Sequence, residues 1–179
     1  MWNTWISFRK GKKKSRELIL FESQLLTNLC EVQRAIADST YQHGIYRRIQ
    51  IADKKRRDLA IASIRDRIVH RLLYDYLVKI FDKTFLFDVW SCRVGKGLQK
   101  CIERTRMLMQ KNRHGYFWRS DITKFFDHVR HDVLLTAVRR CVTDSAMDKL
   151  ITKVIVSYSR TDSVGGGALK VDREFPLEM

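Results

Sequence analysis

The run from Ile64 to Phe81 constrains the fold of this chain more than any other feature. Its apolar residues come in adjacent pairs, each separated from the next by two residues. The pairs are Ile68/Val69, Leu72/Leu73, Tyr76/Leu77 and Ile80/Phe81. Residues spaced three and four apart share one face of an α-helix. The pattern therefore predicts a long, substantially buried helix, which also carries Arg65, Arg67 and Arg71.

A different period precedes this run. Ile45, Ile49 and Ile51 alternate with polar residues, and after the polar DKKR the alternation resumes at Leu59 and Ile61. A period of two is typical of strands, so we predict an antiparallel hairpin with a strongly positive tip.

Helical spacing recurs on both sides of these elements. Ser15 can cap a helix that has Glu17 in its first turn and ends near Asp38. Two more helices are predicted, over residues 98–110 and after a cap at Asp144 or Ser145.

The charge balance indicates a polyanionic partner. Lysine and arginine total 35 against 20 acidic residues, a formal charge of +15 over 179 residues. Nucleic acid is the first expectation, because the apolar runs are too short and too often interrupted by charge for a membrane span. The basic amino-terminal segment, MWNTWISFRKGKKKSR, is expected to be a solvent-exposed arm that binds phosphate groups.

Four cysteines lie without CxxC spacing among apolar residues: Cys30, Cys92, Cys101 and Cys141. This usage is typical of reduced core cysteines in an intracellular protein, and a cytoplasmic location is expected. This spacing favours neither disulfide bonds nor a zinc site. His128 and His131 are expected on a helix surface, since no third zinc ligand is in view. Gly165 to Gly167 are expected to form a hairpin loop.

An acid stands in an unusual place at Asp121. The turn-forming NRHG leads into an expected strand from Tyr116 to Ile122, in which Trp118 is expected to pack into the core rather than stack on bases. Asp121 near the end of that strand is followed at once by paired phenylalanines. A strand-end carboxylate in a basic chain can hold a divalent ion for phosphoryl transfer, or it can simply cap a solvated turn.

The stretch that begins at this acid, DITKFFDHVRHDVLL, resembles the first palm motif of the reverse transcriptases of bacterial retroelements. That group includes group II introns, retrons and diversity-generating elements. By this resemblance Asp121 is the first catalytic, metal-binding aspartate, and the backbone carbonyl of Ile122 is a further metal ligand. Phe126 matches the aromatic residue beneath the incoming sugar. Asp127 and Asp132 are expected to be structural.

Two upstream stretches resemble the fingers of the same family. In DKKRRDLAIASIRDRIVHRLL, Lys55 and Arg57 fall where the family grips the nucleotide triphosphate, and Arg65 begins the template-side helix, paired with the acid that follows it. Alone, DKKRR would be a solvated turn. In CRVGKGLQKCIE, Arg93 and Lys96 are expected to contact the nucleic-acid backbone.

The chain also departs from the family. EFPLEM has Glu174 and Glu178 where the family places glycines, and the second acidic motif, with its paired aspartates, is absent. A site for two metal ions needs carboxylates from both motifs. The chain is therefore expected to be an amino-terminal fragment, inactive alone.

Together these features predict an α+β chain with a right-hand polymerase architecture, helix-rich with a short antiparallel sheet. Residues 1–40 form a basic extension and helix, 41–112 the fingers, and 113–179 a partial palm. The resemblance implies RNA-directed DNA synthesis in the complete parent, with two Mg²⁺ ions, an RNA template, a DNA or RNA primer and dNTPs. The alternative is a non-catalytic RNA- or DNA-binding remnant of a retroelement protein.

Overall fold

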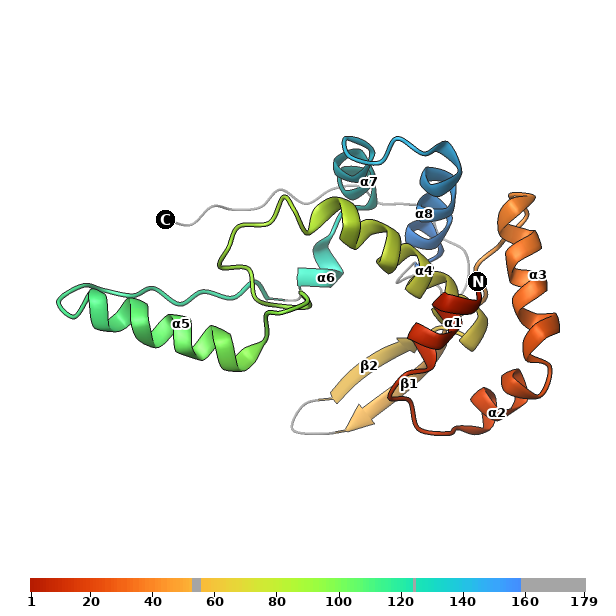
Figure 1. The fold of residues 1–179 in the computed structure, drawn as a ribbon, viewed down its shortest axis with the longest axis horizontal. Helices are drawn as coiled ribbons and strands as arrows, with labels where there is room; N and C mark the ends of the chain where they lie inside the picture. Colours follow the sequence, from red (N-terminus) through yellow and green to blue (C-terminus); the bar gives the residue numbers. More distant parts are fainter. Residues whose placement is uncertain (53–55, 124, 159–179) are drawn as a thin grey trace.

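The structure is a computed structural model that describes residues 1–52, 56–123 and 125–158, without the side chains of 51, 52, 56–58 and 127. These residues form eight helices and one two-stranded antiparallel sheet (Figure 1). The helix-rich α+β composition agrees with the sequence prediction. The division into fingers and palm stays a prediction.

The predicted central helix is confirmed as α4, Ile64–Phe81. It begins where the backbone N–H of Asp66 donates to the Ser63 hydroxyl at 3.2 Å, which satisfies one of the amide groups left open at a helix start. Ile68 and Val69 are fully buried. In Figure 1, α4 crosses the middle of the molecule, and two hydrophobic clusters lie along it.

The first cluster joins the amino-terminal helices to the start of α4. Helices α1 (Trp2–Arg9), α2 (Arg16–Ser23) and α3 (Leu25–Ala37) contribute to it together with α4. Its buried members are Trp5, Phe8, Leu18, Leu29, Ile64 and Ile68. The expected solvated arm is thus wrong for residues 1–9, because Trp5 and Phe8 share one helical face that is buried. Lys10 to Arg16 are exposed, as expected.

The second cluster joins the remainder of α4 to three other helices. These are α3 (Leu25–Ala37), α7 (His131–Arg139) and α8 (Ser145–Ser157). Its buried members are Val32, Tyr41, Val69, Leu73, Leu135, Val138, Val142, Leu150 and Ile151. The Asp144 side chain caps α8, which confirms that part of the prediction.

The predicted helix from Ser15 to Asp38 is broken in two. Ser15 caps it as expected, accepting from Leu18 N at 3.2 Å. Gln24, with φ −126° and ψ 38°, separates α2 from α3. The Asn28 side chain donates to the Phe21 carbonyl at 3.0 Å, so an acceptor freed by the break is satisfied.

Glu17 connects α2 to the start of α4. Its carboxylate accepts from Ile64 N at 2.9 Å and lies 3.4 Å from the Arg67 guanidinium. A helix cap of this kind is worth about 1 kcal/mol, and Glu17 is half exposed, so Glu17→Ala is expected to lower the free energy of unfolding by about 1 kcal/mol. Urea denaturation measures this. Glu103→Ala, which removes only an interaction within one helix, is the control and should have a smaller effect; equal decreases would contradict a capping role for Glu17.

The predicted hairpin is confirmed as β1 (Arg47–Ala52) and β2 (Arg56–Ile61), paired antiparallel with Ile49 opposite Leu59. Lys55, at its expected tip, lies outside the described residues. Arg57 pairs through its backbone with Ile51, and its side chain is not described.

Helix α5 (Leu98–Lys111) is predicted correctly but buries none of its residues, and in Figure 1 it projects away from the helices around α4.

The predicted strand over 116–122 is wrong. These residues pair with no other part of the chain that the structure describes, and a strand needs a partner for its backbone groups. Trp118 is 89% exposed, so its expected place in the core is wrong as well.

The expected burial of the cysteines is not observed. Cys30, Cys92 and Cys141 are exposed free thiols and Cys101 is half-buried. On α3 the reason is the helical period, because Leu29 and Val32 occupy the buried face and Cys30 does not. None of the helices in the described ranges is long and apolar enough to cross a membrane.

Candidate nucleic-acid interface

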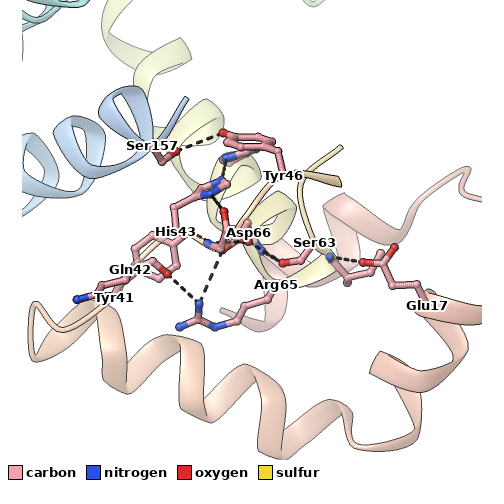
Figure 2. A network of polar contacts seen from close by, with 12 residues as sticks. Glu17, Tyr41, Gln42, His43, Tyr46, Ser63, Arg65, Asp66 and Ser157 are labelled. Atoms are coloured by element: carbon pink, nitrogen blue, oxygen red, sulfur yellow. Dashed lines mark hydrogen bonds and ion pairs between the residues drawn. The ribbon is translucent and has the colours of Figure 1, made fainter. Parts of the chain in front are cut away.

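Asp66, in the first turn of α4, is the centre of a buried polar network (Figure 2). Only 1% of the residue is exposed. Its carboxylate accepts from the Tyr41 hydroxyl at 2.8 Å, from the Ser63 hydroxyl at 2.7 Å and from Gly44 N at 3.2 Å. The network therefore fastens the connection between α3 and β1 to the start of α4.

The network satisfies a charge that burial would otherwise make very costly. Burial, followed by the hydrogen bond to Asp66, raises the pKa of Tyr41, so its hydroxyl stays protonated and donates. Gly44 leaves room for the carboxylate, since a Cβ at that position would lie 2.9 Å from an Asp66 oxygen. A side chain at position 44 would force this contact apart.

Arg65 lies at the solvent side of the same network. Its guanidinium donates to the Gln42 carbonyl at 3.1 Å, lies 3.8 Å from Asp66 and stacks 5.0 Å from the centre of the Tyr41 ring. The expected pairing with Asp66 is present, although the Gln42 carbonyl is the nearer partner. The Arg65 side chain is 40% exposed, so an edge of the cation faces solvent. Its contact with nucleic acid stays a prediction.

Arg93 lies in the connection between α4 and α5 and is mostly buried. It donates to the Asp82 carboxylate at 2.7 Å and to the backbone carbonyls of Asp82, Leu86 and Val89 at 3.0 to 3.3 Å. The hydrogen bond from Arg93 lowers the pKa of Asp82. In this structure the guanidinium thus organises its own loop.

Lys96 is held in the same loop. Its ammonium group donates to the Phe87 carbonyl at 2.6 Å and lies 3.5 Å from the centre of the Phe87 ring and 4.2 Å from that of Trp90. Gly95 and Gly97 flank it with φ of 75° and 131°, values that favour glycine. The predicted contacts of Arg93 and Lys96 with a nucleic-acid backbone would require both cations to exchange these partners.

Asp121, Ile122 and Phe126 lie on an exposed segment. Ile122 is 63% and Phe126 87% exposed, and Phe126 packs edge-on against Phe125 within the short helix α6 (Phe125–His128). Asp121 is exposed. Throughout the described residues, no three His, Cys, Asp or Glu side chains come together as a metal site would need.

The described residues around Asp121 do not by themselves form a site for a pair of Mg²⁺ ions, and the predicted magnesium site stays a prediction. One carboxylate and the Ile122 carbonyl supply too few oxygen ligands for two hard cations. No hydrogen bond or ion pair among the described residues joins Asp121 to Arg65, Arg93 or Lys96.

Part of the Asp66 network had a signal in the sequence. Ser63 and Asp66 have the spacing of a helix capping box, in which the two residues satisfy each other's backbone at a helix start. Tyr41 and Gly44 had none, because they reach Asp66 only through the fold. Another missed contact is that between His43 and His70, whose Nε2 atoms lie 3.0 Å apart.

Comparison with known proteins gives distant similarity to three relatives. The chain is 26% identical over 141 residues to "Protein YkfC" of Escherichia coli, over 76% of this chain and 37% of that protein. It is 26% identical over 123 residues to "Nuclear intron maturase 1, mitochondrial" of Arabidopsis thaliana, over 62% and 17% of the two chains. It is 26% identical over 99 residues to "Putative COX1/OXI3 intron 1 protein" of Saccharomyces cerevisiae, over 55% and 12%. No family model matches.

Two of these relatives are named for introns, and this similarity supports a relation to retroelement proteins at that general level. The chain spans 12 to 37% of the length of the relatives it matches.

Proposed function

We propose that this chain is an RNA-binding module of a retroelement protein related to intron maturases. The observation that carries the proposal is the similarity to an intron maturase over 62% of the chain, in a polypeptide of formal charge +15. The name of that relative connects it to introns, which are excised as RNA. Phosphate contacts from lysine and arginine supply most of the affinity in such complexes.

The placement of the cations supports an interface built from several segments. Lys10 to Lys14 are exposed in the connection between α1 and α2. Arg65 presents an exposed guanidinium edge at the start of α4, held in place by Gln42 and Tyr41. Because Arg65 is already oriented, binding a phosphate there would cost little side-chain entropy.

The basic connection offers a direct test. Replacing Lys10, Lys12, Lys13 and Lys14 with Gln is expected to weaken RNA binding about tenfold or more, because an RNA phosphate that no lysine neutralises keeps its counterion. Fluorescence anisotropy with a labelled single-stranded RNA measures the affinity. Replacing Glu17 with Gln, in the same region, removes a negative charge and is the matched control, which should not weaken binding. Unchanged affinity in the lysine variant would contradict a role for this segment.

A second candidate is RNA-directed DNA polymerase activity in a longer polypeptide. The observation that favours it is the stretch DITKFFDHVRHDVLL, with Asp121 as a catalytic residue and Phe126 beneath the incoming sugar, as the family resemblance implies. Lys55 and Arg57 would then hold the triphosphate. The metal-binding carboxylates missing near Asp121 would have to come from other residues of such a polypeptide.

Primer extension tests this second candidate. On an RNA template with a primer, dNTPs and Mg²⁺, the 179-residue chain is expected to make no product, because the carboxylates that the structure describes around Asp121 are too few to hold two Mg²⁺ ions. A polypeptide lengthened to include paired aspartates after an aromatic residue is expected to extend the primer, and Asp121→Asn should abolish that synthesis. Synthesis by the variant would contradict the assignment of Asp121.

A further inference from the structure

Two histidines from different elements meet at the base of the hairpin. His43 lies in the connection that leads into β1, and His70 lies on α4, one turn after Asp66. Their Nε2 atoms are 3.0 Å apart, and their ring planes are inclined by only 18° with centres 5.1 Å apart. Rings arranged in this way point their Nε2 atoms at one another, which is the geometry of a nitrogen-to-nitrogen hydrogen bond.

The surrounding contacts assign the proton in this bond. His43 Nδ1 lies 2.7 Å from the Gly44 carbonyl, which can only accept, so Nδ1 carries a hydrogen. In neutral His43, Nε2 is then an acceptor, and His70 Nε2 must donate to it. A first additional proton, on His70 Nδ1, leaves this hydrogen bond in place. A second additional proton, on His43 Nε2, would place two N–H donors and two positive charges opposite each other, and the hydrogen bond would be lost.

Charged and aromatic groups face the pair from each element around it. Burial has the largest influence on the pKa of His70 and lowers it, and the neighbouring His43 lowers it further. On α4, Asp66 favours a protonated His70 and Arg67 disfavours it. On the connection before β1, the Tyr46 ring stacks on His43 with centres 4.6 Å apart. From the end of α8, Ser157 and Tyr158 contact Tyr46. Figure 2 shows His43, Tyr46 and Ser157 close together.

We propose that His43 and His70 form a proton-sensitive latch, which fastens the base of the hairpin to α4 near neutral pH and opens when both imidazoles are protonated. The contact between His43 and His70 lies beside the hydrogen bonds of Asp66. Those hydrogen bonds hold the same connection between α3 and β1, but through a carboxylate instead of through imidazoles. Opening would release His43 and Tyr46, and with them the contact that joins the hairpin base to α8. The proposal concerns the hairpin alone and does not depend on the partner that the chain binds.

The sign of the effect follows from the lowered pKa of His70. The folded protein binds fewer protons at this residue than the unfolded chain, so the stabilisation is complete above the ordinary histidine value of 6.5 and is lost as the pH falls below it. Hydrogen exchange of residues 38–52 and 56–61 should reveal the opening locally. Between about pH 7.5 and about pH 5.5, after correction for intrinsic exchange rates, we expect the protection of this segment to fall several-fold.

Two substitutions separate a latch from simple packing. In His70→Gln the amide can still donate to His43 Nε2 but takes up no proton, so the pH dependence of exchange should disappear while protection at neutral pH remains. Should His70→Gln fail to fold, His43→Gln removes the facing imidazole and should weaken the pH dependence of exchange. His114→Gln, which changes an exposed histidine outside the pair, should behave as the wild type. An unchanged pH dependence in the foldable pair variant, or none in the wild type, would overturn the proposal.

Discussion

Asp66→Ala is expected to lower the free energy of unfolding by about 3 kcal/mol, of which about 1–3 kcal/mol comes from the buried Tyr41 hydroxyl left without an acceptor and the remainder from its less buried partners. The substitution removes the acceptor of three hydrogen bonds, from the buried Tyr41 hydroxyl and from the less buried Ser63 hydroxyl and Gly44 N. For a domain of marginal stability this is a large fraction of the total. Urea denaturation followed by circular dichroism measures the decrease.

Two further variants make the test specific. Asp66→Asn keeps the volume and one acceptor, so a smaller decrease in stability is expected than for alanine. Asp75→Ala removes a carboxylate from the same helix that is partly exposed and pairs with Arg71 one turn away, and should cost under about 1 kcal/mol. If Asp66→Ala and Asp75→Ala proved equally mild, the network would not hold the hairpin connection to α4.

The elements that sequence predicts well here are those whose signals are local. The apolar residues of α4 recur at helical spacing, and those of the hairpin alternate as in a strand. Both patterns can be recognised from residues close together in the sequence, without information on distant contacts. The caps at Ser15 and Asp144 are local for the same reason, since each side chain bonds to backbone two or three residues away. The break at Gln24 was missed, because the apolar spacing continues across it.

The failures involve partners far away in the chain. Tyr116 to Ile122 has the composition of a strand, but a strand exists only with a partner, and its aromatic side chains are exposed in the described structure. Asp66 pairs with Arg65, its neighbour, as expected, but its hydrogen bonds from Tyr41 and Gly44 were not predicted, because these residues reach Asp66 only through the fold. Trp5 and Phe8 were assigned to a solvated basic arm because the prediction relied on the charge of the segment and not on the helical spacing of these two residues.

In the candidate site, too, the sequence predicts features with local signals and does not predict the contacts that the fold creates. The motifs located Arg65, Arg93 and Lys96 among basic stretches, but a motif does not reveal what a cation contacts. Arg93 bonds three backbone carbonyls and Asp82, and Lys96 lies between two aromatic rings. These partners are set by the conformation of the connection between α4 and α5, which has no periodic signal.

The affinity of this chain for RNA is expected to fall steeply with salt. Each phosphate contacted on a single strand contributes a slope of about 0.7 in log affinity against log salt, because counterions are released on binding. The exposed cations of Lys10 to Arg16 and Arg65 could together contact about six phosphates, which would lower the affinity roughly 300-fold between about 50 and 200 mM salt. The binding should depend only weakly on RNA sequence, since phosphates carry no base information.

A filter-binding titration of one labelled single-stranded RNA, repeated across this range of salt, tests the central claim most directly. The variant with Gln at positions 10, 12, 13 and 14 serves as the internal control, and its slope should be shallower by about 0.7 for each phosphate that the replaced lysines bind in the wild type. A steep negative slope that becomes shallower in the variant is the result expected of an RNA-binding module. An affinity that does not change with salt, or no binding at low salt, would contradict it.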